Sequence, residues 1–198
     1  MTDGILALQG DYFAHGRVLD KLGRKYIYVK KPEELNQVSS LIIPGGESTT
    51  IRKLAKENGL WELLKRFNGA ILGTCAGIIL LADKTINPPE ETLNRLDVAI
   101  SRNAYGSQIN SFISMGNLPL IGKQIEMVFI RAPKIQDIGN SIEVFAEHNG
   151  EVVGVRSGNI IGLTFHPELA EDTVIYEEFF GLGKSDTRKI RIKIKSSN

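Results

Sequence analysis

The chain contains the stretch Ala70-Ile71-Leu72-Gly73-Thr74-Cys75-Ala76-Gly77-Ile78-Ile79-Leu80-Leu81-Ala82, which joins a short apolar strand to a helical pattern. Glycines two residues before and after Cys75 suit a sharp strand-to-helix turn, because a Cβ at either position would crowd it. Such a nucleophile elbow presents its central side chain in a cleft, above the N–H groups of the helix. The alternative for a free cysteine is an inert, buried apolar residue. The flanking glycines favour the nucleophile, since a core cysteine does not need them.

Length and composition restrict the class of protein. The 198 residues suit one domain with a full core. Apolar and charged contents of 42% and 24% are ordinary for a soluble protein. No apolar run approaches the ~20 residues of a membrane span, and the N-terminus lacks a signal-peptide pattern. We therefore expect a cytoplasmic protein without membrane contact. A single cysteine excludes an internal disulfide and a multi-thiolate metal site.

Charge is unevenly distributed, and it marks a tail. We expect one domain over residues 1–181, followed by a basic tail over 182–198 in which isoleucines alternate with basic residues at 189–195. An extended tail would place these isoleucines on one face. It could pair as an edge strand, touch a partner or RNA, or be disordered. Nucleic-acid binding is the less favoured reading, because the rest of the chain is not basic.

Strand and helix patterns alternate through the first half, which is typical of a parallel sheet covered by helices. We expect strands at 5–8, 26–29, 41–43 and 70–72, a helix after Asp11 with Phe13 and Val18 pointing inward, and another helix over 49–66. Later strand patterns at 98–101, 125–130, 142–146, 152–156 and 160–165 predict an antiparallel extension of the sheet, with hairpin turns at 149–150 and 157–159. Residues 172–180 predict a closing helix.

A thiol nucleophile needs a base, and the base needs an acceptor on its second ring nitrogen. The chain has three histidines. His15 lies in the first helix, where we expect an exposed structural role, and His148 lies in an apparent hairpin turn. His166 directly follows an apolar strand and precedes Pro167-Glu168, so the carboxylate of Glu168 can turn back to hold it. Strand ends in α/β sheets collect such residues, and this pairs His166 with Cys75.

Acyl transfer also needs N–H donors for the oxyanion. The N–H of Ala76, directly after the nucleophile, is placed to supply one. The segment Pro44-Gly45-Gly46-Glu47-Ser48-Thr49-Thr50 can supply a second, because paired glycines after a strand let the backbone turn its N–H groups inward. A phosphate-binding loop is the alternative, but the spacing of its motif and its lysine are absent. A plain strand-to-helix turn capped by Ser48 or Thr49 is compatible with the oxyanion role.

Taken together, the motifs resemble the class I (triad) glutamine amidotransferases. Within that class, the ordered set is similar to the glutaminase subunits of pyridoxal 5′-phosphate synthase over about residues 4–180. Besides the elbow, the glycine loop and 165–169, the resemblance is carried by 8–10, 102–106, 129–133 and 146–150. It implies a three-layer, flavodoxin-like α/β fold with a mixed, mostly parallel sheet, helices on both faces and an antiparallel extension.

The resemblance also implies the reaction and its residues. L-Glutamine would be hydrolysed to glutamate and ammonia through a cysteinyl thioester, with Cys75, His166 and Glu168 as the triad and Gly46 and Ala76 as oxyanion donors. No cofactor and no metal are implied. The substrate would be held by Gly46, Glu47, Ser48, Arg102, Ile130 and Arg131. A cationic arginine and an anionic glutamate complement the two charges of free glutamine.

Ammonia that reaches water becomes ammonium and is lost as a nucleophile, so the family couples the glutaminase to a second subunit. The resemblance implies a heteromeric complex with a barrel-shaped synthase subunit for vitamin B6 biosynthesis. Gln9 falls where the family's first strand meets that subunit, so a role in activation or at the interface is implied. Glutaminases serving another acceptor, such as imidazole glycerol phosphate synthase, are the alternative within the enzymes. A non-catalytic domain that keeps the fold is the alternative outside them.

Overall fold

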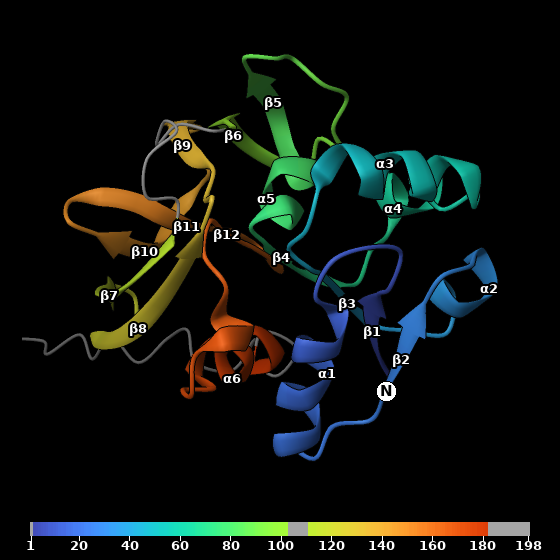
Figure 1. The fold of residues 1–198 in the computed structure, drawn as a ribbon, viewed down its shortest axis with the longest axis horizontal. Coiled ribbons are helices and arrows are strands. Elements are labelled where there is room, and N and C mark those ends of the chain that lie inside the picture. The colour runs from blue at the N-terminus through green and yellow to red at the C-terminus, as the bar shows by residue number, and fades with distance from the viewer. Residues whose placement is uncertain (1, 103–110, 182–198) are drawn as a thin grey trace, which may run out of the picture.

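The computed structural model describes residues 2–102 and 111–181. These residues form a nine-stranded sheet, a separate three-stranded sheet, and helices on both faces of the larger sheet (Figure 1). The predicted basic tail at 182–198 lies outside the described residues, and so do positions 103–106 of one motif used for the resemblance.

The first half of the chain builds four strands of the parallel part of the large sheet, as the alternating pattern predicts. The strand order of this part is β2-β1-β3-β4-β12. The bounds in that order are Tyr26–Val29, Asp3–Leu6, Ser40–Ile43, Ala70–Thr74 and Ile160–Leu163. The fifth strand, β12, comes from the pattern at 160–165 that was expected in the antiparallel extension; it pairs parallel with β4 and antiparallel only with β11 (Glu151–Ser157). The register places Leu41 beside Ile71 and Ile71 beside Ile160. Of these strands, β1, β3, β4 and β12 are buried almost throughout and mostly apolar, as parallel strands covered on both faces are, whereas the edge strand β2 is half-buried.

The second half continues the same sheet with antiparallel strands in the order β11-β10-β7-β8. Their bounds are Glu151–Ser157, Glu143–His148, Ser111–Leu118 and Lys123–Ile130. β10 and β11 are joined by Asn149 and Gly150, which have φ angles of 49° and 78°. Two consecutive positive φ angles are what a tight hairpin needs, so the predicted turn is confirmed.

Helices cover the two faces of the large sheet (Figure 1). One face carries α1 and α6, and the other carries α3, α4 and α5, while α2 and the 3₁₀ turn η1 are short connections. The bounds from α1 to α6, followed by η1, are Tyr12–Lys21, Pro32–Leu35, Ser48–Glu57, Trp61–Arg66, Ala76–Leu81, Val174–Gly181 and Pro167–Leu169. Neighbouring strand residues feed opposite cores: Ile43 packs with α3 and α5, and Ile42 with α1 and α6.

The three-stranded sheet corrects one sequence-based expectation. The strand predicted at 98–101 is β6 (Leu96–Ser101), and it pairs with β5 (Ala82–Ile86) and β9 (Lys134–Ile138) rather than extending the large sheet. The chain passes from the end of α5 directly into β5, which lies beyond the helices on their side of the large sheet (Figure 1). β6 therefore pairs with β5 and β9 in the small sheet on that side.

Two helix predictions were wrong in part. The helix expected over 49–66 is divided into α3 and α4 at Asn58-Gly59, where Gly59 has a φ of 71° that ends a right-handed helix. In α1 the inward face differs from the expected one. His15 is buried and Phe13 is 58% exposed, because Phe13 lies at the surface against the rings of Tyr12 and Tyr28.

Candidate active site

Cys75 lies at the turn between β4 and α5 with a φ of 49° and a ψ of −100°. A positive φ is strained for a residue with a side chain and is typical of a nucleophile elbow. A Cβ on Gly73 would lie 2.5 Å from Leu81, and a Cβ on Gly77 would lie 2.2 Å from the carbonyl oxygen of Ile43. The two flanking glycines are therefore required by close packing, as the sequence predicts.

His166 follows β12 and is fixed by its main chain, because its N–H donates to the carbonyl oxygen of Val128 at 2.8 Å. Pro167 then starts the turn η1, which brings Glu168 back toward the imidazole. The Nδ1 atom of His166 lies 2.7 Å from Oε1 of Glu168. Both side chains are buried. The pairing expected from two residues of separation is thus present.

At this site, hydrogen bonds and nearby charges shift the pKa values of His166 and Glu168 in the direction opposite to the effect of burial. Burial alone would lower the pKa of His166, but hydrogen bonds with Cys75 and with Glu168 raise it to about 10. Burial likewise opposes ionisation of Glu168, whereas its interactions with His15 and His166 lower its pKa below the ordinary value. The arrangement at neutral pH is a protonated imidazole between a carboxylate and Cys75. His166 is thereby placed to exchange a proton with the sulfur of Cys75.

The glycine loop before α3 lies against both reactive side chains. A Cβ on Gly45 would be 2.4 Å from Cε1 of His166 and 3.3 Å from Cβ of Cys75, so only glycine fits there. Gln9, which follows β1, holds the peptide between Gly46 and Glu47. The N–H of Glu47 donates to Oε1 of Gln9 at 2.8 Å. Gln9 therefore contacts the predicted oxyanion loop directly. Ala76, the other predicted donor, is the first residue of α5.

A cleft of about 310 Å³ opens in front of Cys75, at the lower end of the size range of small-molecule sites. Its lining contains most of the residues predicted to bind substrate. It is formed by Gln9, Gly46, Glu47, Ser48, Cys75, Ile79, Arg102, Arg131 and Pro133. The buried hydroxyl of Ser48 has no hydrogen-bond partner among the described residues, so it is available to a ligand. The carbonyl oxygen of Ile130 lies 3.8 Å from the sulfur of Cys75.

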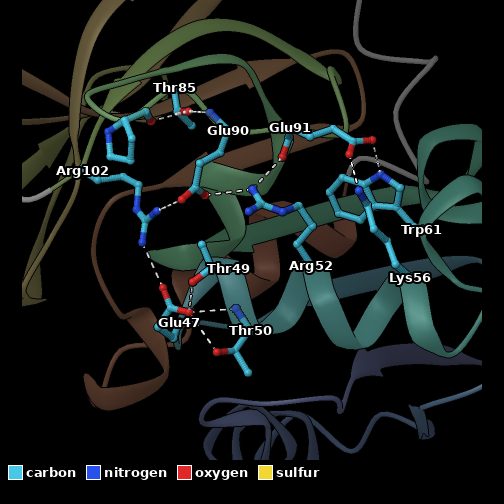
Figure 2. A network of polar contacts seen from close by, with 11 residues as sticks. Glu47, Thr49, Thr50, Arg52, Lys56, Trp61, Thr85, Glu90, Glu91 and Arg102 are labelled. Atoms are coloured by element: carbon cyan, nitrogen blue, oxygen red, sulfur yellow. Dashed lines mark hydrogen bonds and ion pairs between the residues drawn. The ribbon is translucent and has the colours of Figure 1, made fainter.

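A polar network forms the charged side of the cleft (Figure 2). Arg102 donates to Glu47 at 2.9 Å and also pairs with Glu90. Glu90 in turn accepts from Arg52 at 2.9 Å. Burial disfavours the Glu47 carboxylate, but hydrogen bonds from Thr49 and Thr50 lower its pKa to about 2. Glu47 is thus an anion that caps α3 and contacts the predicted substrate-binding arginine.

The structure brings the predicted residues together around one cleft, with His166 and Glu168 behind Cys75 rather than in its lining. Ile79 and Pro133 line the cleft, and Glu90 contacts Arg102, although sequence reasoning singled out none of them. The apolar run after the elbow is the signal that could have found Ile79. Among residues 2–102 and 111–181, no group of His, Cys, Asp and Glu side chains could hold a metal, and no helix could cross a membrane.

The fold is that of a glutamine amidotransferase. A crystal structure of a glutamine amidotransferase, 39% identical in sequence, superposes with a TM-score of 0.87 and covers 92% of this chain and 99% of its own. The SNO glutamine amidotransferase family matches residues 5–182, and the chain belongs to that family. The pyridoxal 5′-phosphate synthase subunit PdxT of Koribacter versatilis is 46% identical over 90% of this chain and 94% of its own length. That of Dictyoglomus turgidum is also 46% identical, over 90% and 97%.

Proposed function

We propose that this chain is the glutaminase subunit of a pyridoxal 5′-phosphate synthase, which hydrolyses L-glutamine and delivers the ammonia to a synthase subunit. One observation supports this function best. Cys75 lies at a strained elbow beside His166, whose Nδ1 atom is 2.7 Å from Oε1 of Glu168. That geometry occurs in a chain of the SNO family whose relatives are named as PdxT subunits. A non-catalytic domain would not need an intact triad.

In the proposed reaction the thiolate of Cys75 attacks the side-chain amide carbon of glutamine. N–H groups of Gly46 and Ala76 stabilise the oxyanion, and the His166 imidazolium protonates the nitrogen as the C–N bond breaks. Ammonia leaves and a thioester remains. His166, now neutral, takes a proton from water, and the resulting hydroxide attacks the thioester. Glutamate leaves and the thiolate is restored. Glu168 orients the imidazole in both halves of the cycle.

Recognition of glutamine rests on the charged side of the cleft. Its α-carboxylate would pair with an arginine, either Arg102 or Arg131, and its α-ammonium with Glu47. The hydroxyl of Ser48, buried and without a partner among the residues described, would accept or donate the remaining hydrogen bond. The main chain at Ile130 would contact the substrate close to the reacting amide, because its carbonyl oxygen lies near Cys75.

The proposed partner is a barrel-shaped synthase subunit that receives the ammonia without its release to water, in the cytoplasm. The contact between Gln9 and the N–H of Glu47 gives a partner a route to the oxyanion loop. Gln9 lies in the segment between β1 and α1, so a subunit docked over this segment would change how the loop presents its N–H groups. We therefore assign Gln9 to activation or to the interface.

Isotope transfer tests this function. The chain is mixed with a PLP synthase subunit, a pentose phosphate, a triose phosphate and glutamine labelled with ¹⁵N in the side-chain amide. We expect ¹⁵N in the pyridoxal 5′-phosphate formed, and no product from Cys75→Ala unless ammonium is added. A parallel mixture with an imidazole glycerol phosphate synthase partner serves as the control. If only the imidazole glycerol phosphate synthase partner stimulated glutamate release, the assignment to pyridoxal 5′-phosphate synthase would be contradicted.

A further inference from the structure

His15 is a fully buried histidine outside the triad, and it touches the triad carboxylate. From α1 it reaches three other elements. Its Nδ1 atom lies 2.8 Å from the hydroxyl of Tyr176 on α6. Its Nε2 atom lies 3.3 Å from Oγ1 of Thr74, the last residue of β4, and 3.5 Å from Oε1 of Glu168. Thr74 directly precedes the nucleophile, so His15 links the elbow strand to the triad carboxylate.

The surroundings of His15 determine its protonation. Burial lowers the pKa of His15, outweighing the opposite effect of Glu168, while His166 lowers it further and Asp11 raises it. Burial also raises the pKa of Tyr176 well above the ordinary value. At neutral pH a protonated phenol therefore faces a neutral imidazole. Because the ionised Glu168 oxygen that lies 3.5 Å from Nε2 can only accept a hydrogen bond, we assign the imidazole proton to Nε2, and the phenol then donates to Nδ1.

The Glu168 carboxylate is buried, and the same oxygen, Oε1, faces both histidines. Oε1 accepts from His166 at 2.7 Å and lies 3.5 Å from Nε2 of His15. The other oxygen has no hydrogen-bond partner among the described residues. A buried carboxylate with so few donors is costly to keep ionised. Nε2 of His15, at 3.5 Å from Oε1, is the second histidine nitrogen that lies close to this anion.

We propose that His15 is a positioning residue of the glutaminase site: its Nε2–H holds the Glu168 carboxylate against His166, and Tyr176 fixes the required tautomer. The proposal rests on the proposed function only for its effect on turnover. Its structural part, the support of Glu168 and through it of His166, stands without a substrate. A histidine with a packing role alone would leave the titration of His166 unchanged.

The first test replaces His15 by leucine, which has a similar volume and no donor. The titration of His166 is followed by NMR in full-length chain labelled with ¹⁵N-histidine. Wild type should titrate near pH 10. In His15→Leu burial pushes Glu168 toward its neutral form, so the His166 midpoint should fall by about one unit or more. In the complex with the synthase subunit, kcat should fall about 10- to 100-fold with KM within about threefold.

Matched variants separate positioning from packing. Val18→Ala removes buried volume from the same helix and should leave both the titration and kcat at the wild-type level. His15→Gln keeps an amide donor near the position of Nε2 and should restore kcat to within about fivefold of wild type. Tyr176→Phe leaves His15 in place but releases its tautomer, so it should lower the His166 midpoint in the same direction as His15→Leu and lower kcat about three- to tenfold with KM unchanged. It also provides the test if His15→Leu does not fold.

Two results would overturn the proposal. One is an unchanged His166 midpoint in folded His15→Leu or, if that variant does not fold, in Tyr176→Phe. The other is wild-type kcat in a variant whose midpoint has moved. Failure of the proposed function has a different signature. In that case the midpoint shifts as expected, but neither the variant nor the wild-type complex releases glutamate from glutamine.

Discussion

The two sides of the cleft are built differently. On one side Cys75, His166 and Glu168 are buried and fixed by the main chain at strand ends. On the other side Glu47 and Arg102 are held by charge pairs, and the Glu47 side chain is 47% exposed. Burial makes each interaction of the triad strong and each loss severe, whereas screened charge pairs contribute little individually. We therefore expect substitutions on the first side to affect kcat and those on the second to affect KM.

The largest expected effect comes from removing the nucleophile. Cys75→Ala should lower glutamine hydrolysis by at least about 10⁴-fold, as loss of a nucleophile does in other triads. Alanine keeps the Cβ, so folding and binding to the synthase subunit should persist. Turnover is measured as glutamate release, and binding by calorimetry with the synthase. Undiminished hydrolysis would remove Cys75 from the mechanism.

His166→Asn should have the next largest effect. It removes the proton carrier while keeping a polar side chain of smaller size, so kcat should fall about 10³-fold or more. The affinity for glutamine, measured by calorimetry, should stay within about threefold, because His166 lies behind the cleft rather than in its lining. Loss of binding together with loss of the folded state would show that the residue is structural only.

Raising the pH should reduce turnover through the same residue. The pKa of His166 is raised from 6.5 to about 10, so kcat should fall as the pH rises through about 10 and the proton donor is lost. The raised pKa also stabilises the fold. This contribution is complete below about pH 6.5 and is lost as the pH rises through about 10. The free energy of unfolding of wild type and of His166→Asn is measured with urea across this range. The difference between the two should narrow as the pH rises. A constant difference would contradict it.

The smallest expected effect lies on the charged side. Glu90→Gln weakens the support of Arg102, so KM for glutamine should rise about three- to tenfold while kcat stays within about twofold. Glu91→Gln is the matched control, because the Glu91 carboxylate pairs with Lys56 and Trp61 away from Arg102 (Figure 2). It also pairs with Lys65. The control variant should leave KM unchanged. A fall in KM for Glu90→Gln would mean that Glu90 competes with the substrate and would contradict a supporting role.

The same difference explains what the sequence could predict. Cys75 and the pair of His166 and Glu168 belong to short contiguous motifs whose geometry is local, so their positions followed from spacing. Glu90 contacts Arg102 from a loop twelve residues earlier, and no periodicity signals such a pair. His15 was expected at the surface because its burial depends on α6, over 150 residues further along the chain. Contacts between distant segments were the ones missed.

The proposed role of the buried triad is to hydrolyse glutamine for a synthase partner. The most direct test is glutamate release from L-glutamine, measured with and without the PLP synthase subunit. We predict release that the synthase subunit strongly stimulates and that Cys75→Ala abolishes in both conditions. Release from folded Cys75→Ala at the wild-type rate, or none from wild type in the presence of the synthase subunit, would contradict this role.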